Sequence, residues 1–169
     1  FTDDDSNEFI GFDSGNDNNH YDSLTVKGIT FTGKWDTNSD EPFFDIRGET
    51  SRPFTVLFED VVFDDNDGGA LDFRDNVFVT IKDAVFNDNN YGNVNGGAIK
   101  YDNGNYTNGN LTIINSTFTN NTTTNNGGAI YADNIDLTLN NCVLNSNNST
   151  SKGGALTTIG CTVIIDSTN

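Results

Sequence analysis

Short runs of alternating apolar and polar residues recur along the chain. In the run LTIINSTF (111–118), Leu111 and Ile113 flank Thr112, and a second short stretch ends at Phe118. Alternation with a period of two predicts strands with one buried face, and β-branched and aromatic residues at the apolar positions favour strands over helices. Similar runs return at intervals of 23 to 32 residues: LTVKGITF (24–31), VLFEDVVF (56–63), VTIKDAVF (79–86), LTLNNCVL (137–144) and CTVIIDST (161–168).

Four of these runs are followed by a polar tract that closes with Gly-Gly-Ala and an aliphatic residue. The copies are FDDNDGGAL (63–71), FNDNNYGNVNGGAI (86–99), FTNNTTTNNGGAI (118–130) and the weaker LNSNNSTSKGGAL (144–156). A sharp corner between strands needs positive φ and close backbone approach, which glycine allows. Asparagine also tolerates the left-handed region, and equivalent asparagines can form ladders between coils. We therefore interpret these glycines as structural corners: Gly68, Gly69, Gly96, Gly97, Gly127, Gly128, Gly153 and Gly154.

Each repeat contains three short strands and is too small to bury a core by itself, so stacked repeats must share one. The pattern predicts an all-β fold, a right-handed parallel β-helix (β-solenoid) of five to six coils with three short strands per coil. The Asn-Gly steps at 95–96, 103–104, 108–109 and 126–127 leave an antiparallel sandwich as an alternative, although hairpins do not explain the fixed place of the Gly-Gly-Ala motif. The side chains expected to stack inward are Val79, Ile81, Phe86, Leu111, Ile113, Phe118, Leu137 and Leu139.

The chain divides into two predicted parts. Residues 1–23 are acidic and lack the repeat, so we interpret them as an N-terminal cap or exchange segment. Residues 24–169 form the β-helix, with recognisable repeats over 55–160. A long loop excursion at 32–53 carries Trp35, and its FFDI segment predicts a further strand.

The motif F-x-x-N followed by GGA[ILV] resembles the repeat of polymorphic outer membrane proteins, which also marks adhesin-like surface proteins of methanogenic archaea. The resemblance implies a right-handed β-helix displayed outside the cell, usually for adhesion, and implies no catalytic residues. The fourth copy departs from the pattern, because Leu144 stands in place of phenylalanine. The matching positions are Phe63, Asn66 and Gly68–Leu71, then Phe86, Asn89 and Gly96–Ile99, then Phe118, Asn121 and Gly127–Ile130.

Composition narrows the class of partner. The chain has 25 acidic and 8 basic residues and a formal net charge of −17, so it repels phosphate backbones and nucleic acid is not expected as a partner. No run approaches the roughly 18–20 apolar residues that a membrane span needs, so direct membrane insertion is not expected. The 13 phenylalanines and the regular aliphatic positions argue against disorder.

Few residues offer catalytic or metal-binding chemistry. His20 is the sole histidine and lies in an acidic segment that resembles a solvated surface. Calcium is the one candidate cofactor, because Asp36, Asn38 and Asp40 alternate as in a calcium loop. Glu41 and Arg47 nevertheless occupy positions where the loop motif requires glycine and glutamate. The expectation is therefore no cofactor, with calcium as the alternative.

Two further residue types bear on an extracellular location. Cys142 and Cys161 fall in different columns of the repeat, where Cys142 matches Ser116 and Ala84 and Cys161 matches Leu137, so two small buried thiols are expected rather than a disulfide. Sequons Asn-x-Ser/Thr are dense, and exposed corner asparagines tolerate glycans. The glycosylation candidates are Asn105, Asn110, Asn115, Asn120, Asn121, Asn147 and Asn148.

These features predict a non-enzymatic structural or adhesive β-helix module, extracellular and displayed on a cell surface. The first alternative is the protomer of an extracellular filament that assembles head to tail, and the second is a polysaccharide-acting β-helix enzyme. The expected partners are other copies of the chain or neighbouring solenoid coils, and a cell-surface protein or glycan.

Overall fold

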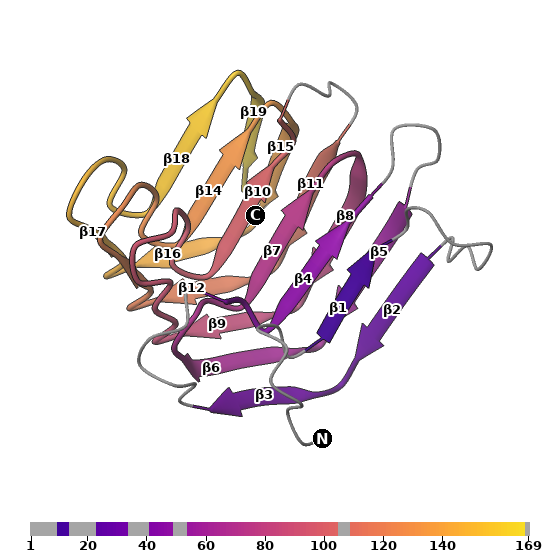
Figure 1. Cartoon of the computed structure of the whole chain (residues 1–169), viewed down its shortest axis with the longest axis horizontal. Coiled ribbons are helices and arrows are strands. Elements are labelled where there is room, and N and C mark those ends of the chain that lie inside the picture. The colour runs from indigo at the N-terminus through magenta and orange to yellow at the C-terminus, as the bar shows by residue number, and fades with distance from the viewer. Residues whose placement is uncertain (1–9, 14–22, 34–40, 49–53, 105–108, 168–169) are drawn as a thin grey trace.

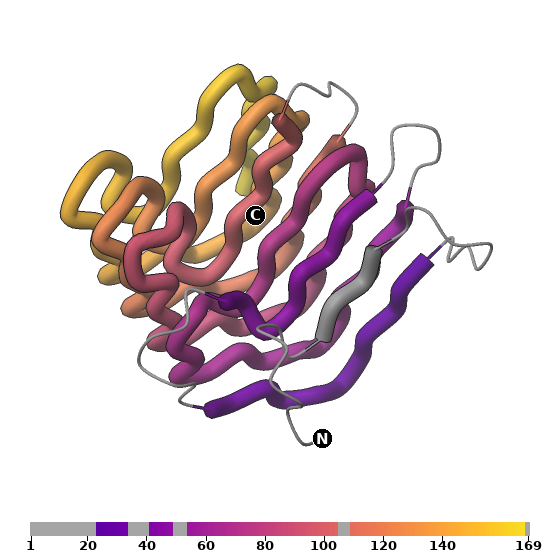
Figure 2. The backbone as a smooth tube through the Cα atoms, viewed as in Figure 1, coloured from indigo at the N-terminus to yellow at the C-terminus, as the bar shows by residue number. Residues whose placement is uncertain are grey.

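The computed structural model describes residues 10–13, 23–33, 41–48, 54–104 and 109–167, of which 10–13 are described by their backbone only. The described residues form short strands and turns, and no helix among them is long and apolar enough to cross a membrane. Figures 1 and 2 show the chain winding in successive coils, so that strands one coil apart lie side by side.

The strands form three long faces and one small sheet. The first face contains β1 (Ile10–Asp13), β4 (Phe44–Arg47), β7 (Leu71–Arg74), β10 (Ile99–Asp102), β14 (Ile130–Asp133) and β18 (Leu156–Ile159). The second contains β2 (Ser23–Lys27), β5 (Phe54–Glu59), β8 (Val77–Lys82), β11 (Asn110–Ile114), β15 (Asp136–Asn140) and β19 (Thr162–Asp166). The third contains β3 (Thr30–Gly33), β6 (Val62–Asn66), β9 (Val85–Asn87), β12 (Thr117–Thr119) and β16 (Val143–Asn145). The small sheet pairs β13 (Thr122–Thr123) with β17 (Asn148–Ser149).

Every strand pairs with the strand one coil away, and the pairs are parallel, as in β8 with β11 and β7 with β10. This topology confirms the all-β parallel solenoid with three strands per coil and rules out the antiparallel sandwich. When a coil is taken to begin on the second face, β1 precedes the first complete set of three strands and β19 follows the last. The number of coils therefore depends slightly on which face is taken as the start.

The core consists of columns of equivalent side chains. On the second face, Val79, Leu111 and Leu137 occupy the same register position, and Ile81, Ile113 and Leu139 occupy the next inward position. On the third face, the rings of Phe31, Phe63, Phe86 and Phe118 stack with centroid spacings of 4.9, 5.2 and 4.6 Å. All eight side chains predicted to point inward are at most 2% exposed. The strand period therefore identifies these eight core positions.

Two regions differ from the sequence prediction or extend it. Residues Ile10–Asp13 pair with β4 of the same chain, so part of the N-terminal segment adds a strand to the first face. Thr162 pairs with Asp136 and Val163 with Leu137, so Cys161 precedes that pairing and does not align with Leu137. The predicted alignment of Cys161 with Leu137 was wrong by two residues, because Val163 and Ile165 are the residues that align with the inward positions of β15. Trp35 and His20 lie outside the described residues.

Candidate functional site

A ladder of asparagine side chains runs inside one corner of the solenoid. Nδ2 of Asn66 donates to Oδ1 of Asn89 at 2.7 Å, Asn89 donates to Asn121 at 2.8 Å, and Asn121 donates to Asn147 at 2.9 Å. The same nitrogens donate to a phenylalanine carbonyl oxygen of the preceding coil, for example from Asn121 to Phe86 at 3.0 Å. The F-x-x-N part of the motif therefore joins one coil to the next through both of its residues. The ladder that the sequence predicts between corner asparagines is confirmed here.

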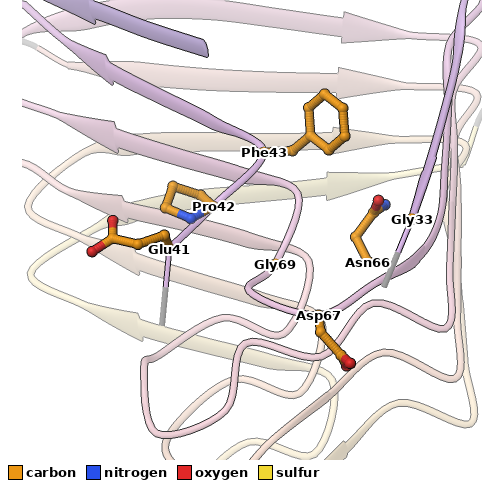
Figure 3. A pocket seen from close by; sticks show the side chains of 7 residues that line it. All are labelled: Gly33, Glu41, Pro42, Phe43, Asn66, Asp67 and Gly69. Carbon is orange, nitrogen blue, oxygen red and sulfur yellow. The ribbon is translucent and has the colours of Figure 1, made fainter. Parts of the chain in front are cut away.

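The ladder begins at a position that lacks its partner. In the first coil, Gly33 pairs with Asn66 across a register shift, so no side chain donates to Asn66 from that position. Oδ1 of Asn66 is buried without a hydrogen-bond partner among the described residues. A cavity of about 10 Å³, lined also by Glu41, Phe43 and Asp67, lies beside it (Figure 3). Such a space holds at most about one water molecule, which excludes a larger ligand.

Next to the ladder, three loops project from the solenoid and form a loop stack, which we define as residues 90–97, 122–128 and 148–154. Figure 2 shows them as successive bends on one side of the solenoid. Backbone hydrogen bonds join them, from Thr124 N to Gly92 O at 2.8 Å and from Thr150 N to Thr123 O at 3.2 Å. The side chain of Asn126 donates to Asn95 Oδ1 at 3.1 Å. These bonds between coils fix the shape of the loops.

The loop stack differs from the rest of the chain in charge. Its three segments contain asparagine, threonine, serine, glycine, one tyrosine and one valine, and Lys152 is their only charged residue. The chain as a whole carries 25 acidic residues. The loop stack is therefore a preorganised surface without carboxylates on a strongly anionic protein, and partners that are repelled elsewhere can approach it.

The two glycines of the pair that ends each loop have different structural roles. The first glycines, Gly96, Gly127 and Gly153, have φ of 76°, 73° and 63°, as the corner prediction requires. Gly128 does not have a positive φ; instead, a Cβ there would lie 2.6 Å from backbone atoms of Asn148. The second glycine is therefore needed for close approach between coils. In the first repeat, Gly68 and Gly69 both have positive φ.

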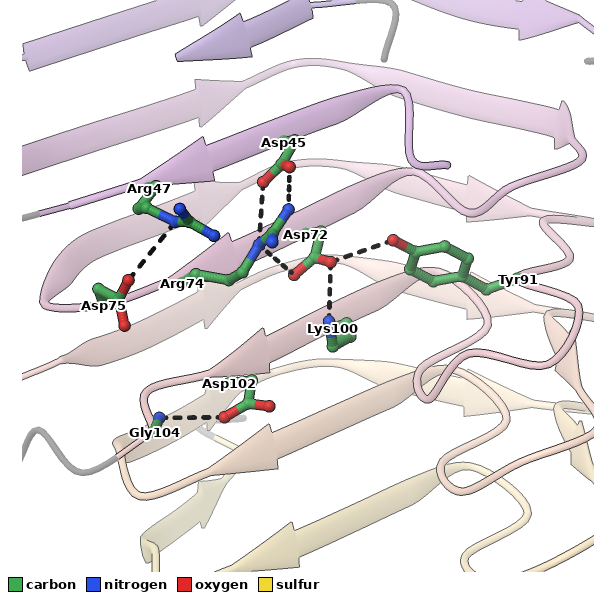
Figure 4. A network of polar contacts seen from close by, with 9 residues as sticks. All are labelled: Asp45, Arg47, Asp72, Arg74, Asp75, Tyr91, Lys100, Asp102 and Gly104. Atoms are coloured by element: carbon green, nitrogen blue, oxygen red, sulfur yellow. Dashed lines mark hydrogen bonds and ion pairs between the residues drawn. The ribbon is translucent and has the colours of Figure 1, made fainter. Parts of the chain in front are cut away.

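A cluster of charged side chains lies on the outer side of the first face (Figure 4). Asp72 is 3% exposed, and its Oδ2 accepts hydrogen bonds from Lys100 Nζ at 2.9 Å and from Tyr91 Oη at 3.1 Å. Arg74 forms an ion pair with Asp45 and lies 4.0 Å from Asp72 Oδ1. Burial raises the pKa of Asp72, and the nearby Lys100 ammonium opposes that rise. Burial likewise raises the pKa of the Tyr91 hydroxyl.

The cluster is a structural anchor. Tyr91 belongs to the loop stack and is 1% exposed, and its ring covers Gly69, where a Cβ would lie 2.7 Å from the ring. A carboxylic acid catalyst must reach its substrate directly or through one water molecule, whereas Asp72 is covered by Tyr91 and occupied by Lys100. The cluster thus fastens the first loop of the stack to β7 and β10, and its buried carboxylate is inaccessible to a polysaccharide.

The predicted site residues fall into different environments. Asp36, Asn38, Asp40 and Asn105 lie outside the described residues. Within the described residues, no group of three or more His, Cys, Asp or Glu side chains is arranged to hold a metal ion. Cys142 and Cys161 are half-buried free thiols, and Sγ of Cys142 lies 3.4 Å from the carbonyl oxygen of Ile113. Burial raises the pKa of the Cys142 thiol.

The sequon asparagines also differ from one another. Asn115, Asn120 and Asn148 are exposed, and Asn110 is half-buried on the outer side of the second face. Asn115 is exposed but engaged, because it donates to Asp83 at 3.1 Å and accepts from Asn141 at 2.9 Å. Asn121 is fully buried in the ladder, which contradicts its interpretation as an exposed corner acceptor. The sequence did not separate these residues, because ladder and corner asparagines are adjacent in it.

Comparison with known proteins supports the resemblance. Residues 115–133 match the family model described as Chlamydia polymorphic membrane protein (Chlamydia_PMP) repeat. The matched segment contains Phe118, Asn121 and the Gly127–Ile130 motif, so it includes one asparagine of the ladder, one ring of the phenylalanine stack and one loop of the loop stack. No curated protein and no solved structure gives a significant match to the chain. The repeat is named for a membrane protein, which suggests a protein of the outer membrane or cell surface.

Proposed function

We propose that the chain is a non-enzymatic, adhesin-like module displayed at the cell surface and that the loop stack is its contact surface. The observation that carries this proposal is the contrast between the loop stack and the rest of the chain. Hydrogen bonds between coils fix the loops, and Lys152 is their only charged residue. A rigid surface loses little conformational entropy on binding, and a surface without carboxylates does not repel anionic cell surfaces.

The motif residues explain why such a scaffold suits adhesion. Asn121 and Phe118 stabilise the interior, whereas the exposed positions Asn93 and Thr124 lie in the loops and face solvent. Exposed loop residues can therefore vary between proteins without loss of the ladder. A cell-surface protein or glycan is the class of partner that fits a neutral, amide-rich and hydroxyl-rich surface.

The test measures attachment of the purified chain to cultured animal cells by flow cytometry. Asn93→Asp with Asn95→Asp adds two carboxylates to the loop stack and keeps the oxygen atoms that accept bonds from Thr124 and Asn126. The matched control, Asn110→Asp with Asn140→Asp, adds the same charge to the second face. Attachment is expected to fall at least tenfold for the loop variant only. Equal attachment of the two variants, or no attachment of the parent chain, would refute the proposal.

A filament remains the second candidate function, and the C-terminal part of the described solenoid favours it. There, β16, β18 and β19 each pair on one side only, and Ile165 is 70% exposed although its column points inward. Unpaired edges and exposed core positions suit the stacking of a further coil, from the same chain or from another copy. Electron microscopy of the concentrated chain, with deletion of residues 1–12 and with Ile165→Asp, tests self-assembly. Filaments that persist in both variants would exclude head-to-tail stacking.

A further inference from the structure

Two of the sequon asparagines, Asn121 and Asn147, use the nitrogen of the side-chain amide for hydrogen bonds within the ladder. Nδ2 of Asn121 donates to Phe86 O at 3.0 Å and to Asn147 Oδ1 at 2.9 Å. Nδ2 of Asn147 donates to Phe118 O at 3.0 Å. An N-linked glycan is attached to this nitrogen. A glycan on Asn121 would remove ladder bonds and would have to fit inside a fully buried corner, so it is incompatible with the folded coil.

The hydroxyl residues of these two sequons also have a structural role. Oγ1 of Thr123 donates to Gly92 O at 3.1 Å and accepts from Asn125 N at 3.0 Å. Oγ of Ser149 donates to Asn125 O and accepts from Ser151 N at 3.0 Å. The hydroxyl two residues after the ladder asparagine thus starts the loop and joins it to the previous coil. The Asn-x-Ser/Thr spacing at 121–123 and 147–149 therefore follows from the fold.

Asn120 and Asn148 are adjacent to the ladder residues in sequence but have the opposite environment. Both are exposed, and neither side chain forms a hydrogen bond within the part of the chain that the structure describes. Their backbone nitrogens hold them in place, bonded to Asn145 O and Asn121 O. Asn120 lies at a corner with a φ of 56°, and Asn148 lies in β17. Each presents an unused amide nitrogen to solvent.

We propose that Asn120 and Asn148 are acceptors for N-linked glycans and that the overlapping sequons of Asn121 and Asn147 serve the fold alone. In the transfer, Nδ2 attacks the anomeric carbon of a lipid-diphosphate-linked sugar. The new C–N bond replaces the C–O bond to the diphosphate, and Nδ2 loses one proton as the lipid diphosphate leaves. The two glycans lie on adjacent coils where the third face meets the loop stack. Asn148 belongs to the loop stack, so its glycan would lie on the proposed contact surface, whereas the test below identifies the modified residues without any measurement of attachment.

The test is secretion of the full chain from a eukaryotic host that transfers N-glycans, followed by site-resolved glycopeptide mass spectrometry of the secreted, protease-resistant protein. Thr122→Ala removes the sequon of Asn120 and leaves that of Asn121, and Thr150→Ala removes the sequon of Asn148 and leaves that of Asn147. Thr122→Ser and Thr150→Ser keep both sequons and are the matched controls.

Each alanine variant is expected to lose one glycan, and each serine control to retain it. Occupancy of Asn121 or Asn147 in the folded protein would overturn the proposal, and so would secreted folded protein without a glycan at Asn120 and Asn148. If an alanine variant is not secreted, the site map of the parent chain decides by itself, because it distinguishes the two members of each overlapping pair.

Discussion

The side chain of Asn121 accepts two hydrogen bonds from Asn89, one from the backbone nitrogen at 3.1 Å and one from Nδ2 at 2.8 Å. Asn147 accepts the same pair of bonds from Asn121, at 3.0 and 2.9 Å. Each ladder asparagine thus pairs polar groups of two coils that would otherwise be buried without partners. Since an unpaired buried amide costs about 1–3 kcal/mol, the ladder specifies the stacking register as well as stabilising it.

Replacement of Asn121 by alanine should therefore be strongly destabilising. The change leaves the backbone and side-chain nitrogens of Asn89 and the carbonyl oxygen of Phe86 without this partner. We expect a loss of about 3 kcal/mol in the free energy of unfolding, measured by chemical denaturation. Asn148→Ala, which removes an exposed amide next to the ladder residue Asn147 at a position without positive φ, is the control and should change that energy by less than about 0.5 kcal/mol. Equal losses for the two variants would show that the ladder contributes no stability.

The sequence predicts the strands, the inward columns and the ladder because each depends on a local period or on a repeated motif. Leu111, Ile113 and Phe118 follow one another at strand spacing, and their equivalents in other coils do the same. The Asp72 cluster has no such signal. Lys100 and Tyr91 reach Asp72 from the next coil and from an irregular loop, so only the stacked structure brings them together.

Two errors of detail have the same physical origin. The environment of Gly128 depends on how closely Asn148 of the following coil approaches, and the sequence does not specify this distance. The register of Cys161 depends on how its strand pairs with β15, where Val163 pairs with Leu137 and Ile165 with Leu139. Contacts between coils settled both points, whereas the sequence pattern describes one coil at a time.

Gly128→Ala tests close approach between coils. Because the added Cβ would clash with the carbonyl oxygen of Gly154 and lie 2.6 Å from backbone atoms of Asn148, the coils must separate, and we expect a loss of about 3 kcal/mol in unfolding free energy. Gly154→Ala is the matched control, since its Cβ would lie 3.5 Å from the nearest atom, Asn147 O. Thermal denaturation of both variants makes the comparison. Equal melting temperatures for the Gly128→Ala and Gly154→Ala proteins would contradict the close approach between coils at Gly128.

Phe86→Ala tests the aromatic column. Phe86 is fully buried between Phe63 and Phe118, with interplanar angles of 11° and 2°. Its removal opens a cavity in the middle of the stack, for which we expect a loss of about 3–5 kcal/mol. Val85→Ala is the control, because Val85 is 39% exposed on the outer side of β9. Denaturant titration should separate the two variants by several kcal/mol, and similar midpoints would argue against a packed column.

The pH dependence of stability tests the buried carboxyl of Asp72. Burial raises its pKa in the folded chain above the ordinary value of 3.8, so the folded state binds more protons than the unfolded state between those two values. The stability linked to this group is present below pH 3.8 and is lost as the pH rises through the folded pKa. We therefore expect the melting temperature of the parent, minus that of Asp72→Asn, to decrease as the pH rises from 3.8.

The other carboxylates are present in both proteins and cancel from this difference. Glu59 is one example, since hydrogen bonds from Lys27 and then Lys82 lower its pKa, and that contribution is lost at low pH in both proteins. Asp136→Asn removes an exposed carboxylate from β15 and provides the control for charge alone. If the difference between the parent and Asp72→Asn instead grew with pH, the ion pairs with Lys100 and Arg74 would outweigh burial. Asp72 would then stabilise the first loop of the stack in its charged form.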